Sequence, residues 1–189
     1  ERFIEVSITG RRCDLSCPMC GGRWLRGMRS APSPAELAEV LRSAFSSGAR
    51  GALISGGFDR TGRLRVEGFL DVIREIKREF DPVLSVHPGL VGEDEAEALA
   101  LAGFDIADVE VIPGSSLLAK GLPVTHEDYL RSLEILMERG PRFVAPHVLV
   151  GAPGSSLDDL VYVMRRVADL DPYLVILLFF IPTPGTPLA

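Results

Sequence analysis

Three cysteines lie within eight residues of the sequence, at Cys13, Cys17 and Cys20, and the chain has no other cysteine. Their spacing is C-x3-C-x2-C. Thiolate sulfur is the protein ligand of iron–sulfur clusters, and an electron-transfer cluster normally takes four thiolates. Three thiols without a fourth would hold three corners of an iron–sulfur cubane and leave one iron with a free coordination site. An open iron can bind and activate a small molecule, so the motif predicts an enzyme.

Other chemistries fit these cysteines less well. An odd number of thiols argues against a disulfide framework. Structural zinc takes four ligands, commonly as two separated pairs, so a zinc site would need His87 or His147 from elsewhere in the chain. Zinc and three free, reduced thiols remain the alternatives to a cluster.

The composition limits the class of protein. Hydrophobic residues make up 47% of the 189, which is typical of strands buried on both faces of a parallel sheet. The longest apolar run, residues 174–181, is too short to span a bilayer, and the N-terminal residues show no secretory signal pattern. We therefore expect a cytoplasmic protein without a membrane partner.

Charge gives a mixed picture. The net charge of −6 argues against broad binding to nucleic acid. An arginine-rich stretch nevertheless surrounds the cysteines: Arg11, Arg12, Arg23, Arg26 and Arg29. It is either a solvated loop or a site for anionic groups of a cofactor, a substrate or an electron donor.

Strand-like and amphipathic helix-like segments alternate along the whole chain. We expect strands at residues 3–9, 51–54, 83–86, 106–112, 143–150 and 173–181. Helix signals separate them: Ser33, Thr125 and either Ser155 or Ser156 as N-caps, and glycines as stops. The alternation implies right-handed β-α-β crossovers and a six-stranded parallel α/β sheet, as a partial barrel or an open doubly wound fold. We expect one domain over residues 1–189, a fragment without a C-terminal extension.

In both architectures, functional sites gather at the carboxyl ends of the strands. Six segments are expected there, most of them rich in glycine or proline: the cysteine loop, residues 55–57, residues 85–89, Glu110, residues 151–154 and residues 182–185. Their common position predicts a shared pocket.

The cysteine motif in this order of elements resembles the radical S-adenosylmethionine superfamily, over essentially the whole chain. The resemblance implies a six-stranded parallel partial (β/α)6 barrel of the TIM type. It implies that Cys13, Cys17 and Cys20 hold a [4Fe–4S] cluster, whose fourth iron binds S-adenosylmethionine. It also implies a one-electron donor of the flavodoxin or ferredoxin type.

The resemblance extends to residues that would contact S-adenosylmethionine. Met19 would lie beside the adenine, and Glu110 matches the acidic ribose-binding position, although it could be a charged rim residue. Phe58 departs from the family pattern, which usually has a glutamate there. The residues that would receive the methionine amino group are Ser55, Gly56 and Gly57.

Later segments resemble the family less closely. The adenine-packing motif of the fifth strand is matched by Leu149, Val150 and Gly151, and Pro182 begins the motif after the sixth strand. His87 and His147 lie near the rim. Each is either a locally hydrogen-bonded histidine or a contact on the substrate side.

Three segments, residues 86–90, 146–151 and 182–187, resemble biotin-synthase-like proteins, including two-subunit lipoyl synthases of archaea. The implied reaction is reductive cleavage of S-adenosylmethionine to a 5′-deoxyadenosyl radical, which abstracts hydrogen from an organic substrate. The enzyme would be of the transferase or oxidoreductase type. Sulfur insertion would need a second cluster from a partner or a missing tail, and the substrate or partner could be a protein. Because of Phe58, a catalytically lapsed, partner-binding subunit is the alternative.

Overall fold

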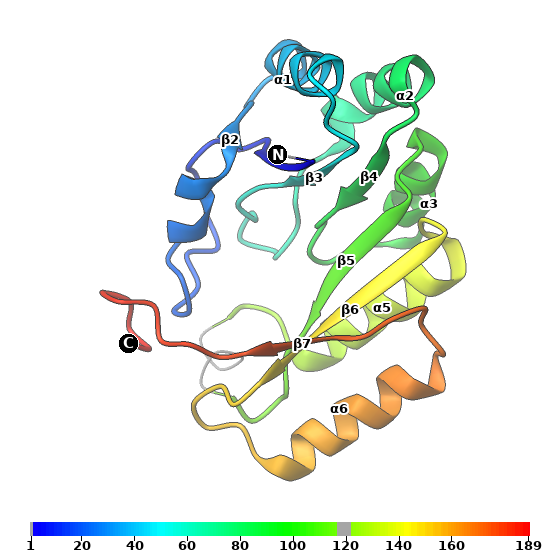
Figure 1. The fold of residues 1–189 in the computed structure, drawn as a ribbon. Helices are drawn as coiled ribbons and strands as arrows, with labels where there is room; N and C mark the ends of the chain where they lie inside the picture. The colour runs from blue at the N-terminus through cyan, green and yellow to red at the C-terminus, as the bar shows by residue number, and fades with distance from the viewer. Residues whose placement is uncertain (1, 117–121) are drawn as a thin grey trace.

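A computed structural model describes residues 2–116 and 122–189 of the chain (Figure 1). In these ranges seven strands form one all-parallel sheet in the order β2-β1-β3-β4-β5-β6-β7. The sheet curves, and the α-helices lie on its outer side. The strands are β1 (Phe3–Ser7), β2 (Arg29–Ser30), β3 (Gly51–Ser55), β4 (Val83–Val86), β5 (Ile106–Val111), β6 (Phe143–Val150) and β7 (Ile176–Phe179).

The helices begin where the sequence predicts them. Ser33 caps the first helix by accepting from Glu36 N, and Thr125 forms a capping box with Asp128. Of the two serines proposed before the last helix, Ser156 is the cap. The helices are α1 (Pro34–Ser46), α2 (Leu70–Phe80), α3 (Glu93–Ala102), α5 (His126–Arg139) and α6 (Leu157–Asp169), with short 3-10 helices η1 (Arg23–Gly27) and η2 (Glu67–Phe69).

The α/β class and the six expected strands are confirmed, and the sheet gains one strand. β2 has only two residues, paired with Val6 and Ser7 at the free side of β1. A two-residue strand carries no readable alternation. The last strand is shorter than predicted, because regular pairing with β6 covers only Ile176–Phe179 of residues 173–181.

Alternation along the strands separates the core from the site. Strand side chains such as Ile54, Val86 and Val109 point outward and are buried against helix residues such as Leu37 and Leu133. Each such side chain contributes about 1.5–3 kcal/mol when it leaves water. Successive strand residues point to opposite faces. The residues that alternate with these aliphatic ones therefore point to the inner face of the sheet. No helix in the described ranges is long and apolar enough to cross a membrane.

A partly buried ion pair, which we call the clamp, joins Lys77 and Asp105 and fixes β4 against β5 at the opposite end from the cysteines. The carboxylate of Asp105 accepts from Leu84 N at 2.8 Å and from Lys77 Nζ at 2.9 Å. Lys77 Nζ also donates to the carbonyl of Pro82 at 2.7 Å. One ion pair therefore joins α2 to the two strands that carry the central part of the inner face.

Replacing Asp105 with asparagine should lower the free energy of unfolding by roughly 1.5–3 kcal/mol, the usual range for a hydrogen bond to a charged group. Urea denaturation measures this loss. Asp81→Asn is the matched control, because Asp81 lies 3.4 Å from the same lysine but is 88% exposed. Its effect should stay below about 1 kcal/mol. Equal losses in the two variants would contradict the clamp.

Candidate active site at the carboxyl ends of the strands

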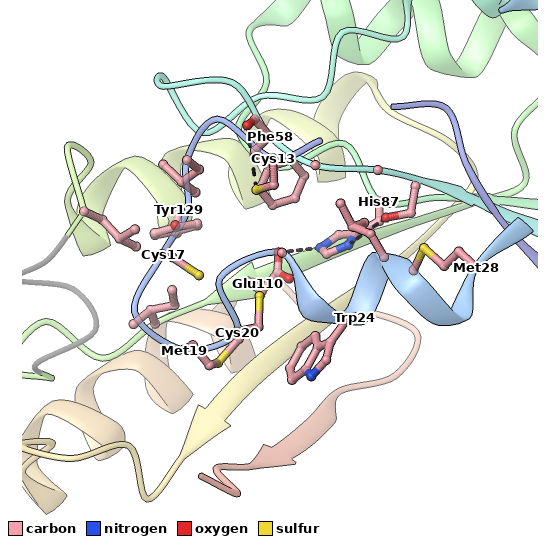
Figure 2. A pocket seen from close by; sticks show the side chains of 18 residues that line it. Cys13, Cys17, Met19, Cys20, Trp24, Met28, Phe58, His87, Glu110 and Tyr129 are labelled. Atoms are coloured by element: carbon pink, nitrogen blue, oxygen red, sulfur yellow. Dashed lines mark hydrogen bonds and ion pairs between the residues drawn. The ribbon is translucent and has the colours of Figure 1, made fainter. Parts of the chain in front are cut away.

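A cavity of about 120 Å³ opens at the carboxyl ends of the strands (Figure 2). Its walls come from the loop after β1, from η1, from the ends of β3, β4 and β5, and from α5. Most of the residues predicted from the sequence line it: Cys13, Cys17, Met19, Cys20, Ser55, Gly56, Gly57, His87 and Glu110. The shared pocket expected from six loops is therefore present, built mainly from four of them.

The remaining predicted residues lie elsewhere. Leu149 is buried in a small apolar cluster with Cys17 and Met19, just outside the cavity. Val150 is the last residue of β6, and Gly151 follows it. Pro182 is exposed beyond β7. None of these three lines the cavity. His147 also lies outside its lining, on the inner face of β6.

The three cysteines are all partly buried and free of disulfides. The thiols of Cys17 and Cys20 share a hydrogen bond, which lowers the pKa of Cys17 and raises the pKa of Cys20. The Cys13 thiol points instead at the carbonyl of Phe58, 3.9 Å away (Figure 2). One member of the pair is thus readily ionised, as a thiolate ligand must be.

The three sulfurs face one cavity but do not converge on a single point. Within residues 2–116 and 122–189, no three cysteine, histidine or acidic side chains are close enough together to hold a metal ion. The donor chemistry fits an iron–sulfur cluster, because each thiolate of a cubane binds a different iron and the three sulfurs need not meet at one ion. Gly21 and Gly22, with φ of +52° and +73°, end this loop in a backbone conformation that glycine adopts freely.

The turn after β3 holds the cysteine loop in place. The carbonyl of Phe58 accepts from Asp14 N at 2.9 Å and from Leu15 N at 3.0 Å. A Cβ atom at Gly57 would lie 2.0 Å from the carbonyl oxygen of Arg12 and 2.5 Å from Cys13 Cα. Glycine at this position is therefore required by the close approach of two backbones, a packing role that sequence reasoning missed.

His87 and Glu110 form a partly buried pair on the cavity floor (Figure 2). His87 Nε2 bonds Glu110 Oε2, and His87 Nδ1 lies 3.5 Å from Ser55 Oγ. The rings of His87 and Phe58 meet edge to face, with their centroids 5.3 Å apart. The sequence placed both charged residues at the rim, but their pairing depends on how the two strands are staggered.

The charges of this pair stabilise each other. Burial alone would lower the pKa of His87, but the charge and hydrogen bond of Glu110 outweigh it and raise that pKa. Burial alone would raise the pKa of Glu110, but the charge and hydrogen bond of His87 outweigh it and lower that pKa. The contact therefore favours the imidazolium–carboxylate form of this pair over its neutral form.

Apolar and aromatic residues make the rest of the wall, and sequence reasoning missed several of them. Trp24 and Met28 come from η1 and its end, and Tyr129 from α5. Burial raises the pKa of Tyr129, so its phenol stays protonated. The only tryptophan of the chain, four residues after the last cysteine, was a signal that could have identified η1 as a wall.

A partial parallel barrel with three free thiols and a buried polar floor at the carboxyl ends of its strands defines a class of proteins that bind a metal cluster or cofactor in the barrel mouth. The family model described as "Radical SAM superfamily" matches residues 7–167. The chain belongs to the radical SAM superfamily.

Individual relatives are distant. The chain is 27% identical over 197 residues to a biotin synthase of Streptomyces coelicolor and 26% identical over 197 residues to one of Streptomyces avermitilis, covering 97% of this chain in both cases. It spans only 46% and 48% of those proteins. The crystal structure of methylornithine synthase (PylB) matches with a TM-score of 0.72 at 17% identity, over 98% of this chain and 55% of that one. This last likeness shows the fold alone.

Replacing Gly57 with alanine should displace the cysteine loop, because the new Cβ would collide with its backbone. We expect a lower melting temperature and faster alkylation of Cys13, and mass spectrometry measures the alkylation rate. Gly27→Ala is the control, since Gly27 lies near the same loop and its Cβ would meet nothing within 4 Å. Unchanged alkylation in the Gly57 variant would contradict the docking described above.

Replacing Glu110 with glutamine should lower the pKa of His87, which NMR titration of labelled histidine measures. The raised pKa of His87 adds stability below its unfolded value of about 6.5, and this is lost as pH rises through the folded pKa. The lowered pKa of Glu110 adds stability above about 4.3, lost as pH falls through its folded pKa. The difference in the free energy of unfolding between wild type and variant should therefore be largest between about pH 4.3 and about pH 6.5. Glu97→Gln, an exposed change on α3, should leave the His87 titration unaltered.

Proposed function

We propose that this chain binds a [4Fe–4S] cluster and S-adenosylmethionine in the cavity and starts radical chemistry on an organic substrate. The observation that carries the proposal is the meeting of all three thiols with the His87–Glu110 pair in one cavity. Family membership supports it, because radical SAM proteins typically use this cluster and this cosubstrate. When bound, the reduced cluster supplies the electron that cleaves S-adenosylmethionine to methionine and a 5′-deoxyadenosyl radical, which abstracts hydrogen from the substrate.

Cys13, Cys17 and Cys20 would be the three cluster ligands. Their loop is anchored by the Phe58 carbonyl at its start and closed by Gly21 N donating to the Cys17 carbonyl at 3.0 Å. These bonds hold the loop over the barrel mouth while leaving its thiols partly exposed to the cavity.

The other residues would bind and orient S-adenosylmethionine. One oxygen of Glu110 is held by His87, and a carboxylate has lone pairs to spare for sugar hydroxyls. Met19 and Leu149 already pack in one apolar cluster, which suits an adenine ring. Backbone groups at Gly56 and Gly57 would receive the amino group. We extend this proposal to Ser55, Val150, Gly151 and Pro182 on the sequence resemblance alone.

The apolar wall has a second task. A carbon radical reacts with whatever it meets, so the site must exclude water and competing polar groups. Phe58, Trp24 and Ile112 line the cavity and keep most of its wall apolar. The protein thereby contributes binding, orientation and shielding, while the cofactor contributes the difficult step.

The finer reaction is also a proposal. The two biotin synthases support a biotin-synthase-like reaction, but the chain spans about half of each. Its three cysteines all belong to one motif, so sulfur insertion would need a sulfur donor from outside these residues. A flavodoxin- or ferredoxin-type donor would supply the electron, and a protein partner or substrate would complete the assembly.

Phe58 favours a second candidate function. Its ring stands where the family usually has an acid and packs against His87 instead. A chain that has lost this contact to the amino group could retain the cluster and the fold while serving only to bind a partner. The two candidates differ in whether S-adenosylmethionine is cleaved.

Anaerobic reconstitution should load about four irons per chain, and dithionite with S-adenosylmethionine should then yield 5′-deoxyadenosine, measured by mass spectrometry. Alanine at Cys13, Cys17 or Cys20 should reduce both the iron and the product to background, because no other thiol can replace the lost ligand. Gly27→Ala should behave as wild type.

Two outcomes would contradict the enzyme proposal. A full cluster with no 5′-deoxyadenosine would favour the partner-binding subunit. Stoichiometric zinc in place of iron, with no iron–sulfur absorbance after reconstitution, would favour a zinc protein.

A further inference from the structure

The sheet has two free edges, and one segment bridges them at the barrel mouth. In the described part of the chain, β2 and β7 each pair on one side only, so the barrel is open between them. After β7 the chain runs back beside the loop that carries the cysteines (Figure 1). We call residues 180–188 the strap. It leads from one edge strand to the loop that joins β1 to the other.

The strap is held near both of its ends. At its start, Phe180 N donates to the carbonyl of Val150 at 2.8 Å, which continues the pairing of β7 with β6. Near its end, Leu188 packs against the same buried apolar cluster as Cys17 and Met19. The Phe180 side chain packs against this cluster as well. The strap therefore shares an apolar contact surface with the cysteine loop.

A tight turn over residues 183–186 forms the middle of the strap. The carbonyl of Thr183 accepts from Thr186 N at 3.1 Å and from Thr186 Oγ1 at 2.8 Å. Gly185 has a φ of +75°, a conformation that glycine adopts freely. Three prolines in the strap restrict their own φ angles. The turn is thus pre-organised, so little backbone freedom is lost when another group binds to it.

Arg23 joins this turn to the cysteine loop. Its Nη1 donates to the carbonyl of Pro184, and its Nη2 donates to the carbonyl of Gly185 at 3.0 Å. Two nitrogens of one planar group thus meet two successive carbonyls, a geometry that a guanidinium offers and an ammonium does not. The backbone of Arg23 is fixed too, because its N donates to the carbonyl of Cys20 at 3.0 Å. One residue therefore connects the strap to the end of the cysteine motif.

We propose that Arg23 is a positioning residue that holds the strap across the open side of the mouth, where the strap shields the thiols of Cys17 and Cys20. This inference rests on the proposed function, which places a cluster at those thiols. Oxidation of a thiol depends on its exposure, so a cover over these two protects the site. Cys13 is placed independently of the strap, because its thiol points at the carbonyl of Phe58.

Alkylation of the cluster-free, reduced chain by iodoacetamide tests the strap, with mass spectrometry following each cysteine. We expect Arg23→Gln to speed alkylation of Cys17 and Cys20 relative to Cys13 by about threefold or more, as the loss of a hydrogen bond of ordinary strength implies. Loss of the positive charge alone would have the opposite sign, because a nearby arginine favours the reactive thiolate. Arg26→Gln removes the same charge from an exposed position on η1 and should leave the rates unchanged.

Gly185→Ala disrupts the same contact from the side of the strap, because its Cβ would lie 2.6 Å from Arg23 Nη2. It should speed alkylation of the same two thiols. Gly48→Ala is the matched control, since Gly48 also has a positive φ, +92°, and its Cβ would meet nothing within 4 Å. A double variant of Arg23→Gln and Gly185→Ala should react no faster than the faster single variant, because both changes remove one contact.

Unchanged or slower alkylation of Cys17 and Cys20 in either single variant, or additive effects in the double variant, would overturn the proposal. In reconstituted protein, iron–sulfur absorbance should be lost faster in air from Arg23→Gln than from Arg26→Gln, and equal rates would equally overturn it. If no cluster forms, the proposed function fails, whereas the alkylation rates of the cluster-free chain still decide the role of the strap.

Discussion

The close approach of the cysteine loop to the turn after β3 is the contact on which the site depends. Two backbones meet there at a distance that excludes any Cβ at Gly57. One carbonyl, that of Phe58, accepts two amide hydrogens of the loop at 2.9 and 3.0 Å. Backbone bonds of this kind fix the start of the loop without using its side chains. The thiols are thus left free for ligands.

The same alternation that builds the core also builds the site. Outward residues of β3, β4 and β5 are uniformly aliphatic and pack against the helices. The polar inward residues at or just after the same strands are Ser55, Ser85, His87, Asp108 and Glu110, which would be costly to bury singly. These side chains are hydrogen-bonded to one another, and their bonds offset the free-energy cost of removing them from water. The outer packing holds the strands rigidly enough to keep these pairs aligned.

The sequence was sufficient where the signal is local. N-caps at Ser33 and Thr125, the strand runs and the C-x3-C-x2-C motif each depend on a few neighbouring residues, and the structure contains all of them. It was insufficient where distant segments meet. The pairing of His87 with Glu110 depends on the stagger of β4 against β5, and the role of Gly57 depends on a loop more than forty residues earlier in the chain. Val150, Gly151 and Pro182 were placed at the site by resemblance; they do not line the cavity, although Leu149 and Ala152 beside them pack with Cys17 and Met19.

Phe58 contributes to this arrangement through both its backbone and its side chain. Its backbone performs the anchoring task, which any residue could supply, while its side chain closes the apolar wall and packs edge-on against His87. An acid at this position would add a second carboxylate beside His87, which already pairs with Glu110. A neutral ring avoids that repulsion and lowers the local polarity around the His87–Glu110 pair, which strengthens it. The neutral ring of Phe58 and the partly buried His87–Glu110 pair are therefore consistent parts of one electrostatic arrangement.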